Sequence, residues 1–507
     1  MPLDASRTDL SLAVVGTGVM GRGIAQIAAQ AGIRVMLYDT RSEAAPAARD
    51  HVAQMISRLA EKGRLAPDAA KAAIGRIEIA NVLEHLEPCD VVVEAVVEEL
   101  EAKRQLFGQL EGIVSPECVL ATNTSSLQVT AIAATCKRPD RIAGFHFFNP
   151  VPLMKVVEVI DGVMTAPWVG DALTRLAERM GHTPVRAKDT PGFIVNHAGR
   201  AYGTEAFQIL REGIAEFHQI DRVLREGAGF RMGPFELLDL TGLDVSHSVM
   251  ESIYNQYYQE PRYRPSPIAA QRVVAGLFGR KSGGRGFYRY TDGKAESIAD
   301  APVPPATDSP VWVSRAGLGA DLDDLLTKLD PRGKRGAATD DRALCLVAPL
   351  GSDATTAALA EGLDPARTVA VDCLTGLTKR RTLMTTPLTT PAMRDAAHAL
   401  LAKDGVPVTV IHDSPGFVAQ RVIAQIVNIG ADIAQQRIAT PQDIDRAVTL
   451  GLGYPIGPLA WGDAIGPARI LAILGELFDF YQDPRYRPSP WLKRRARLGV
   501  SLLTPEA

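Results

Sequence analysis

The feature that most limits the fold of this chain is the glycine-rich turn Gly16-Thr-Gly18-Val-Met-Gly21, which lies between two apolar segments. Residues 12–16 form a short apolar run typical of a buried parallel strand, and residues 24–31 form an apolar helix. A second strand, 33–38, ends at Asp39. A glycine turn between strand and helix, with an acidic residue about 20 positions later, is the fingerprint of a dinucleotide-binding fold.

Each glycine of this turn has a separate physical role. Gly16 makes the tight turn, Gly18 removes a side chain that would block a pyrophosphate, and Gly21 lets helix and strand pack closely. The N-terminus of the helix offers free N–H groups to phosphates. Asp39 suits the ribose hydroxyls and repels a 2′-phosphate, which favours NAD over NADP, although Arg41 lies close by. The alternative is a glycine-rich turn that binds no ligand.

The chain then alternates between strands and helices. Further strand-like runs are 90–95, 118–121 and 141–145, and 98–110 is helical. Such alternation predicts a parallel sheet with helices on both faces. Ligands of these sheets bind beyond the carboxyl ends of the strands. The residues at those ends are polar: 94–98, 122–126 and 146–150.

Two residues in this region have the chemistry of a proton-transfer pair. His146 directly follows a strand, and an imidazole titrates close to neutral pH, as a base for an alcohol proton should. Glu158 interrupts the apolar run 156–160, where a carboxylate is costly unless it is paired. Such a partner would hold the imidazole in one tautomer, as in catalytic triads. The alternative is a core histidine near an unrelated carboxylate.

The segment Asp189-Thr-Pro191-Gly-Phe-Ile-Val-Asn196 is predicted to begin a helix. Asp189 or Thr190 would cap this helix, and Pro191 fits its first turn. Asn196 stands among apolar residues. Its amide is suited to orient a substrate carbonyl, or else it is a buried structural amide.

Six motifs occur in order over roughly residues 10–290. They are Gly16-x-Gly18-x-x-Gly21, Asn123-Thr-Ser-Ser126, His146-Phe-Phe-Asn-Pro150, Asp189-Thr-Pro-Gly-Phe193, Gly233-Pro-Phe-Glu-Leu-Leu-Asp239 and Lys281-Ser-Gly-Gly-Arg-Gly-Phe-Tyr288. Together they resemble the 3-hydroxyacyl-CoA dehydrogenase family. The resemblance implies NAD-dependent, reversible oxidation of (S)-3-hydroxyacyl-CoA to 3-oxoacyl-CoA in the cytoplasm of a bacterium.

The resemblance also assigns roles to residues. It makes His146 the base with Glu158 as its partner, and Ser125 a hydrogen-bond donor to the substrate oxygen; Asn196, with Asn149, completes the site. At the cofactor it places Gly16, Gly18, Gly21, Asp39, Glu98, Lys103, Asn149 and Lys281. The family binds the CoA nucleotide partly with basic residues of the first helical excursion. Arg58, Lys62 and Arg64 stand there, with a solvated helix face as the alternative.

The last third of the chain repeats the helical part of the first. Asp413-Ser-Pro-Gly-Phe417 lies 224 residues after Asp189-Thr-Pro-Gly-Phe193, and Gly453–Leu459 follows Gly229–Phe235 at the same offset. A third match is the stretch 481–490, which nearly duplicates 258–267. These matches indicate an internal duplication. The second copy lacks the candidate catalytic residues, because at this offset Ala370 takes the position of His146 and Gln420 that of Asn196.

We therefore expect a doubly wound α/β Rossmann-type NAD-binding domain, then an all-α domain, a linker, a degenerate α/β segment and a second, non-catalytic all-α domain. The predicted ranges are 1–187, 188–292, 293–310, 311–412 and 413–507. Within the degenerate segment, 311–329 is a worn strand–turn–helix, with Leu322 where a third glycine would stand. We hypothesise that the second copy packs on the first and replaces part of a dimer contact. Independent folding is the alternative, and a homo-oligomer is left open.

Charge and composition argue against other classes of protein. The formal net charge of −3 gives no basic field for nucleic acid or a membrane surface. The N-terminus has no apolar secretory segment, and no apolar run approaches the roughly 20 residues of a membrane span. Five cysteines without paired spacing indicate reduced core thiols, and no pattern indicates a metal site.

The acyl chain of the substrate is the least constrained feature. The two-copy architecture resembles the phenylacetate-degradation branch of the family, which acts on 3-hydroxyadipyl-CoA. A 3-hydroxybutyryl-CoA dehydrogenase and a non-catalytic NAD-binding relative are the alternatives. A lysine-based β-hydroxyacid dehydrogenase is disfavoured by the spacing of His146 and Glu158.

Overall fold

The computed structural model describes residues 3–280, 283–331, 333–375 and 377–506. These residues form two compact units. The first contains the chain up to His197 together with Gln436–Leu452, and the second contains Ala198–Gln435 and Gly453–Glu506. Among the described residues, no helix is both long and apolar enough to cross a membrane.

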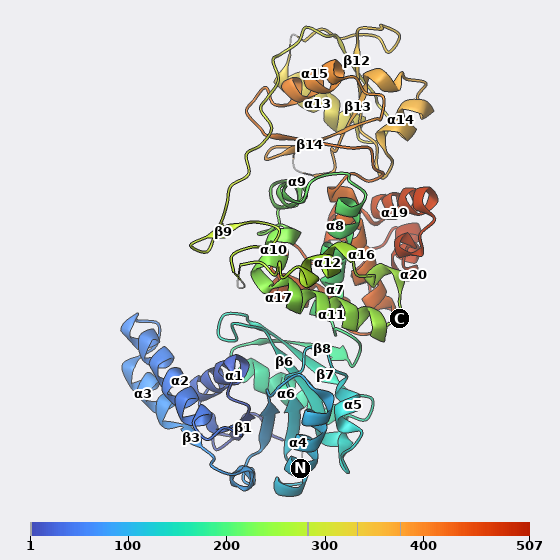
Figure 1. Ribbon diagram of the computed structural model, residues 1–507. Coiled ribbons are helices and arrows are strands. Elements are labelled where there is room, and N and C mark those ends of the chain that lie inside the picture. Colours follow the sequence, from blue (N-terminus) through green and yellow to red (C-terminus); the bar gives the residue numbers. More distant parts are fainter. Residues whose placement is uncertain (1–2, 281–282, 332, 376, 507) are drawn as a thin grey trace. The chain divides into compact units, whose positions relative to one another are not determined.

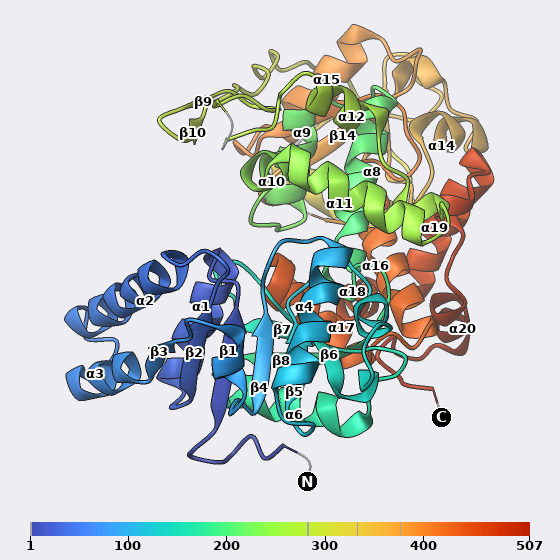
Figure 2. The same cartoon turned by 60° about the horizontal axis from the view of Figure 1, so that its bottom comes forward.

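An eight-stranded sheet forms the centre of the first unit, in the order β3-β2-β1-β4-β5-β6-β7-β8. Figure 2 shows β3, β2, β1 and β4 side by side. The strands are β1 Ser11–Val15, β2 Arg34–Tyr38, β3 Ile77–Ile79, β4 Val91–Glu94, β5 Val119–Thr122, β6 Ile142–Phe147, β7 Val156–Asp161 and β8 Thr183–Lys188.

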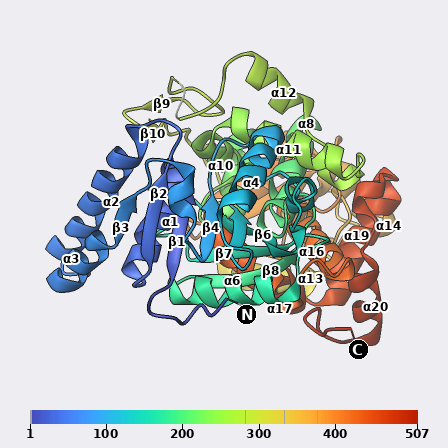
Figure 3. The same cartoon turned by 90° about the horizontal axis from the view of Figure 1, so that it is seen from below.

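Helices cover both faces of this sheet, as the strand–helix alternation predicts. One apolar core joins the strands to α1, α2, α3 and α6, and α4 lies on the opposite side of the sheet from α6 (Figure 3). The helices are α1 Val19–Gln30, α2 Ala44–Glu61, α3 Pro67–Gly75, α4 Leu100–Ile113, α5 Val129–Ala133, α6 Pro167–Arg179 and α7 Val195–Ala198.

One pair of strands departs from the parallel sheet that the sequence predicts. β7 is antiparallel to β6, whereas the other neighbours are parallel. The connection between them contains only residues 148–155. A parallel return needs a crossover of about a dozen residues or more, so this short loop forces the chain to reverse.

The segment after β8 corrects the expected start of a helix. Gly192 and Phe193 have φ angles of 78° and 49°, and this left-handed backbone cannot continue in a right-handed helix. Helix α7 therefore begins only at Val195. The carboxylate of Asp189 accepts the N–H groups of Val129 at 3.0 Å and Thr130 at 2.7 Å, so it caps α5 instead of the helix that follows it.

A helix from the last part of the chain completes the first unit. Helix α17, Pro441–Leu452, packs against β7 and β8 (Figure 2). Ahead of this helix, the carbonyl of Ile438 accepts the N–H of Lys188 at 2.9 Å. The buried residues Ile444, Ala447 and Val448 of α17 recur at helical spacing and form one apolar face.

The second unit contains the remaining helices around α16, which contacts α8, α18, α19 and α20. Arg421 of α16 is completely buried and bonds Glu205 of α8 at 2.8 Å. The bounds are α8 Arg200–Arg211, α9 Phe217–Arg222, α10 Pro234–Thr241, α11 Leu243–Gln256, α12 Pro267–Val274, α16 Ala419–Gln435, α18 Pro458–Ile465, α19 Pro467–Tyr481 and α20 Pro490–Leu498.

The second unit also contains a five-stranded sheet in the order β11-β12-β13-β14-β15. Helices α13 and α15 share one apolar core with this sheet, and α14 lies on the other side of β12 and β13 (Figure 1). The bounds are β11 Val311–Val313, α13 Gly319–Leu329, β12 Leu344–Val347, α14 Ala354–Ala360, β13 Thr368–Val371, β14 Arg381–Thr385, α15 Pro391–Leu401 and β15 Val408–Ile411. A small hairpin, β9 Tyr290–Thr291 and β10 Lys294–Ala295, precedes it.

Candidate active site

His146 and Glu158 stand directly opposite each other in the antiparallel register of β6 and β7. The imidazole Nδ1 lies 2.6 Å from Oε2 of Glu158. Both side chains are buried, and Glu158 has no exposed surface. Its other oxygen, Oε1, accepts the N–H groups of Ile194 at 2.8 Å and Val195 at 2.9 Å. With acceptor bonds on both oxygens, the carboxylate draws the imidazole proton to Nδ1 and leaves the lone pair on Nε2.

Aromatic rings fix the orientation of the imidazole. The ring of Phe148 lies 4.4 Å from that of His146 between centroids, and the ring of Phe193 lies 5.8 Å away. At the end of β6, the N–H of Phe147 donates to Oδ1 of Asn123, which directly follows β5, at 2.8 Å. Sequence reasoning did not single out this role of Asn123, although it lies in the polar stretch at the end of the neighbouring strand.

Glu98 organises the serine loop that follows β5. Its Oε1 accepts Thr124 Oγ1 at 2.7 Å and the N–H groups of Ser125 and Ser126 at 2.8 and 3.0 Å. The Ser125 hydroxyl lies 3.2 Å from the same oxygen. Burial raises the pKa of Glu98, but the charge of Lys103 and these hydrogen bonds outweigh it and hold the pKa below its ordinary value.

Lys103 and Asn196 flank this loop. Lys103 is buried, with Nζ 2.6 Å from Glu94 Oε1 and 3.3 Å from Glu98 Oε2. Asn196 donates from Nδ2 to the carbonyl of Ser125 at 3.4 Å. The structure therefore brings together Glu98 and Lys103 with Ser125 and Asn196, which come from two other parts of the sequence.

The glycine turn has the close contacts that its sequence predicts. A Cβ on Gly16, where φ is 92°, would lie 2.6 Å from the carbonyl of Ala95, and one on Gly21 would lie 1.9 Å from the carbonyl of Gly16. A Cβ on Gly18 would meet nothing within 4 Å. Gly18 lines a cavity of about 730 Å³ with Gly16 and Asp39, so a side chain here would project into space that a ligand needs.

Asp39 stands at the end of β2 and binds the glycine turn. Its Oδ2 accepts the N–H and hydroxyl of Thr17 at 2.9 and 2.8 Å, and Oδ1 accepts the N–H of Arg41 at 3.1 Å. Burial raises the pKa of Asp39, but these bonds outweigh it and keep the pKa below its ordinary value. The ionised carboxylate and the open space at Gly18 fit an adenosine and its pyrophosphate.

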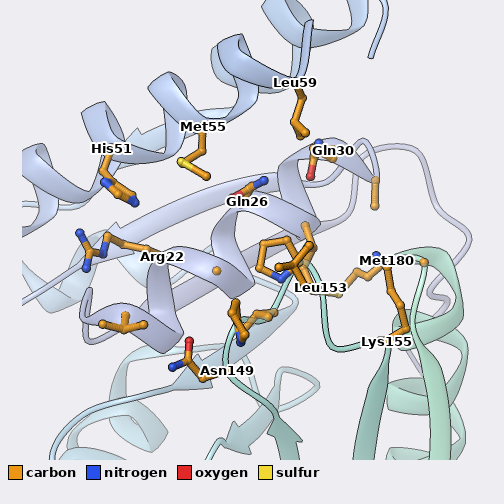
Figure 4. Close-up of a pocket in the computed structure, with 18 of the residues that line it drawn as sticks. Arg22, Gln26, Gln30, His51, Met55, Leu59, Asn149, Leu153, Lys155 and Met180 are labelled. Carbon is orange, nitrogen blue, oxygen red and sulfur yellow. The ribbon is translucent and has the colours of Figure 1, made fainter. Parts of the chain in front are cut away.

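A second hollow lies between α1, α2 and the loop after β6. Figure 4 shows Met55 and Leu59 of α2 facing Gln26 of α1 and Leu153 of the loop. This groove has a volume of about 630 Å³. Asn149 lines it, together with the basic residues Arg22, Arg64, Lys155 and Arg179. Arg58 and Lys62 are exposed near the C-terminal end of α2, outside the described lining of the groove. Lys281 lies outside the described residues.

Comparisons with known proteins agree with this arrangement. The family models for the NAD-binding domain and the C-terminal domain of 3-hydroxyacyl-CoA dehydrogenase match residues 11–190 and residues 192–290 and 416–501. The chain is 38% identical to a protein named 3-hydroxyadipyl-CoA dehydrogenase from Escherichia coli K12, over 96% of this chain and 98% of that one. It is 43% identical to a probable 3-hydroxybutyryl-CoA dehydrogenase from Deinococcus radiodurans, over 55% of this chain and 100% of the relative.

A solved structure is similar over almost the whole chain. The structure titled 3-hydroxybutyryl-CoA dehydrogenase from Escherichia coli K12 has a TM-score of 0.86 and 37% identity, and covers 97% of this chain and 98% of its own. The chain therefore belongs to the 3-hydroxyacyl-CoA dehydrogenase family. It is an oxidoreductase with an NAD-binding Rossmann domain followed by a helical domain, as the sequence predicts.

Proposed function

We propose that the chain interconverts (S)-3-hydroxyacyl-CoA and 3-oxoacyl-CoA at a site built from His146, Glu158, Ser125 and Asn196. The observation that carries this proposal is the buried pair of His146 and Glu158, 2.6 Å apart. Nε2 of His146 removes the hydroxyl proton of the substrate, and Glu158 stabilises the imidazolium that forms. NAD, which the glycine turn and Asp39 would hold, would supply the hydride acceptor for the carbon that carries this hydroxyl.

The other residues bind and orient. Ser125 and Asn196 hold the substrate oxygen, while Asn149 and the three turn glycines lie along the cofactor. Asp39 binds the adenosine ribose. Glu98 and Lys103 fix the serine loop at the cofactor, as their contacts support. Lys281 keeps the cofactor role that the resemblance implies.

We propose that the CoA moiety occupies the groove of Figure 4. Its apolar wall suits a pantetheine chain, and the cations at its rim suit phosphates. Arg58, Lys62 and Arg64 are the candidates to bind the nucleotide end of CoA, and of these three Arg64 lines the groove. Charge-neutralising variants of these three residues would raise KM for acyl-CoA more than KM for free NAD; equal effects on both would argue against this assignment.

The acyl chain is proposed to be 3-hydroxyadipyl, because the relative that matches over almost the whole chain carries that name. The names of the Deinococcus relative and of the solved structure favour 3-hydroxybutyryl as the second candidate. A comparison of kcat/KM on the two substrates decides between them. If NAD binds but NADH is oxidised neither by acetoacetyl-CoA nor by 3-oxoadipyl-CoA, the chain is a non-catalytic relative. The expected cytoplasmic location stays a prediction.

We further propose that residues 311–507 are a degenerate second copy, with the domain boundaries given above. The 224-residue offset relates β5–β8, α5 and α6 to β12–β15, α14 and α15. Asp413 accepts the N–H groups of Ala354 and Thr355, as Asp189 does for α5. Helices α13 and α15 pack on the same face of the five-stranded sheet, as α1 and α6 pack on one face of the eight-stranded sheet. The pair β11–α13 therefore corresponds to β1–α1. Among the described residues no strand corresponds to β2, β3 or β4, and apart from β12 only Arg335 pairs with β11, in a single parallel bridge with Val311.

Packing within the units supports the hypothesis that the second copy packs on the first. Helix α16 lies against α8 with the buried Arg421–Glu205 pair, and α17 lies against β7 and β8. Expression of residues 1–292 alone tests it. A monomeric fragment with full activity and unchanged stability would contradict the hypothesis. Whether whole chains form a homo-oligomer stays a prediction, to be read from the mass in solution.

A further inference from the structure

Glu158 is held on the side that faces away from the imidazole. Its Oε1 accepts two backbone N–H groups, from Ile194 and Val195, while Oε2 faces His146. The position of the Val195 backbone therefore fixes the carboxylate. A small shift of this backbone would move Oε2 relative to Nδ1.

The support behind Val195 comes from the C-terminal part of the chain. Gly451 lies in α17 and belongs to the same compact unit as Val195. A Cβ added at Gly451 would lie 3.0 Å from Cγ2 and 3.1 Å from Cγ1 of Val195, and 3.5 Å from Cγ1 of Val156. Val156 and Glu158 are two residues apart on β7 and point to the same side of the strand. Gly451 thus approaches both elements that hold the carboxylate.

The segment that carries Gly451 is fixed at its start and along one face of its helix. At its start the carbonyl of Ile438 accepts the N–H of Lys188, one residue before Asp189. Along α17, Ile444, Ala447 and Val448 are buried. We propose that residues 436–452 are a positioning element for the His146–Glu158 pair, and that residue 451 is a glycine because a Cβ there would crowd the methyl groups of Val195 and push on its backbone. The inference rests on the roles proposed above for His146 and Glu158.

The test compares Gly451→Ala with Gly475→Ala in the full chain. Both glycines lie in helices of the C-terminal part, and neither has a positive φ. A Cβ on Gly475 would meet nothing within 4 Å, so this variant is the matched control. For Gly451→Ala we expect kcat to fall about tenfold or more, with KM for acyl-CoA and Kd for NAD unchanged.

A spectroscopic signal separates positioning from stability. The Nδ1 proton of His146, bonded to a carboxylate, gives a low-field proton resonance that His146→Gln removes. This resonance should move or weaken in Gly451→Ala and stay unchanged in Gly475→Ala. Adding Val195→Ala to Gly451→Ala removes the crowded methyl groups and should restore kcat and the resonance toward those of Val195→Ala alone.

The outcomes are distinct. The inference is wrong if Gly451→Ala behaves as Gly475→Ala, or if kcat falls while the resonance and the double variant show no response. If Gly451→Ala does not fold, Val448→Ala thins the same packing without crowding it, and an unchanged resonance there also refutes the inference. A wild-type chain without turnover would refute the proposed function, yet the resonance would still report on positioning.

Discussion

Replacing Glu158 with glutamine keeps the volume of the side chain and removes one of its two acceptor oxygens. The remaining oxygen is claimed by the N–H groups of Ile194 and Val195, because buried donors without partners are costly. The amide NH₂ then faces Nδ1 of His146, which must accept instead of donate. The proton of the imidazole moves to Nε2, and the base is lost.

The loss of the reactive tautomer of His146 determines how far kcat should fall. A comparable acid-to-amide change in a catalytic triad lowers kcat about 10⁴-fold, which corresponds to about 5.4 kcal/mol of barrier. We expect a fall of that order when NADH formation from a 3-hydroxyacyl-CoA is followed near neutral pH, with Kd for NAD unchanged. Glu101→Gln, at an exposed ion pair with Arg104 on α4, is the matched control. If Glu158→Gln retains more than about a tenth of wild-type kcat, Glu158 does not set the tautomer.

Three further predictions concern the cofactor, the second unit and pH. Asp39→Ala should raise Kd for NAD about 10- to 100-fold, since hydrogen bonds to a charged group contribute about 1.5–3 kcal/mol; calorimetry that shows unaltered affinity would exclude Asp39 from the site. Arg421→Met removes the closer cationic partner of the buried Glu205 and leaves Arg485 Nε 3.5 Å away and the hydroxyl of Tyr486 at 2.9 Å. It should lower the free energy of unfolding in urea by about 3 kcal/mol, with partial recovery in Glu205→Gln/Arg421→Met; a loss within the range of a surface pair, about 1 kcal/mol or less, would speak against a buried charge. Burial raises the pKa of Asp221 to about 8, so its contribution to stability is fully present below about pH 4 and is lost as pH rises through about 8. Asp221→Asn should therefore reduce the fall of Tm as pH rises through this range. If Tm of the variant and of the wild-type chain fall equally with pH, the pKa of Asp221 is not raised.

The cofactor turn and the proton-transfer pair could be predicted because their signals are local. The spacing of Gly16, Gly18 and Gly21 predicts where the backbone of the turn must come close to its neighbours or to a ligand. A carboxylate inside the apolar run of β7 requires a partner, and the short loop before β7 forces the antiparallel register that supplies His146. The roles of these residues stay proposals.

The contacts that hold the pair could not be predicted, because they join distant segments. Asp189 looks like a local helix cap, yet the left-handed backbone at Phe193 delays the helix, and the buried Glu158 takes the N–H groups at its start. The insertion of α17 against β7 and β8 has no signal in its own sequence beyond one apolar face. Nor does the sequence show that Arg64, which follows α2, lines the groove while Arg58 and Lys62 do not.

In the proposed reaction one histidine, His146, handles the proton at a single site in each chain. The most direct measurement is the turnover of His146→Gln, with NAD binding followed on the same sample. We expect NADH formation to be abolished and Kd for NAD to change little, because the residues proposed to bind the cofactor, Gly16, Gly18 and Asp39, do so independently of the imidazole. Turnover by His146→Gln close to that of the wild-type chain would show that His146 is not the base and would require another one.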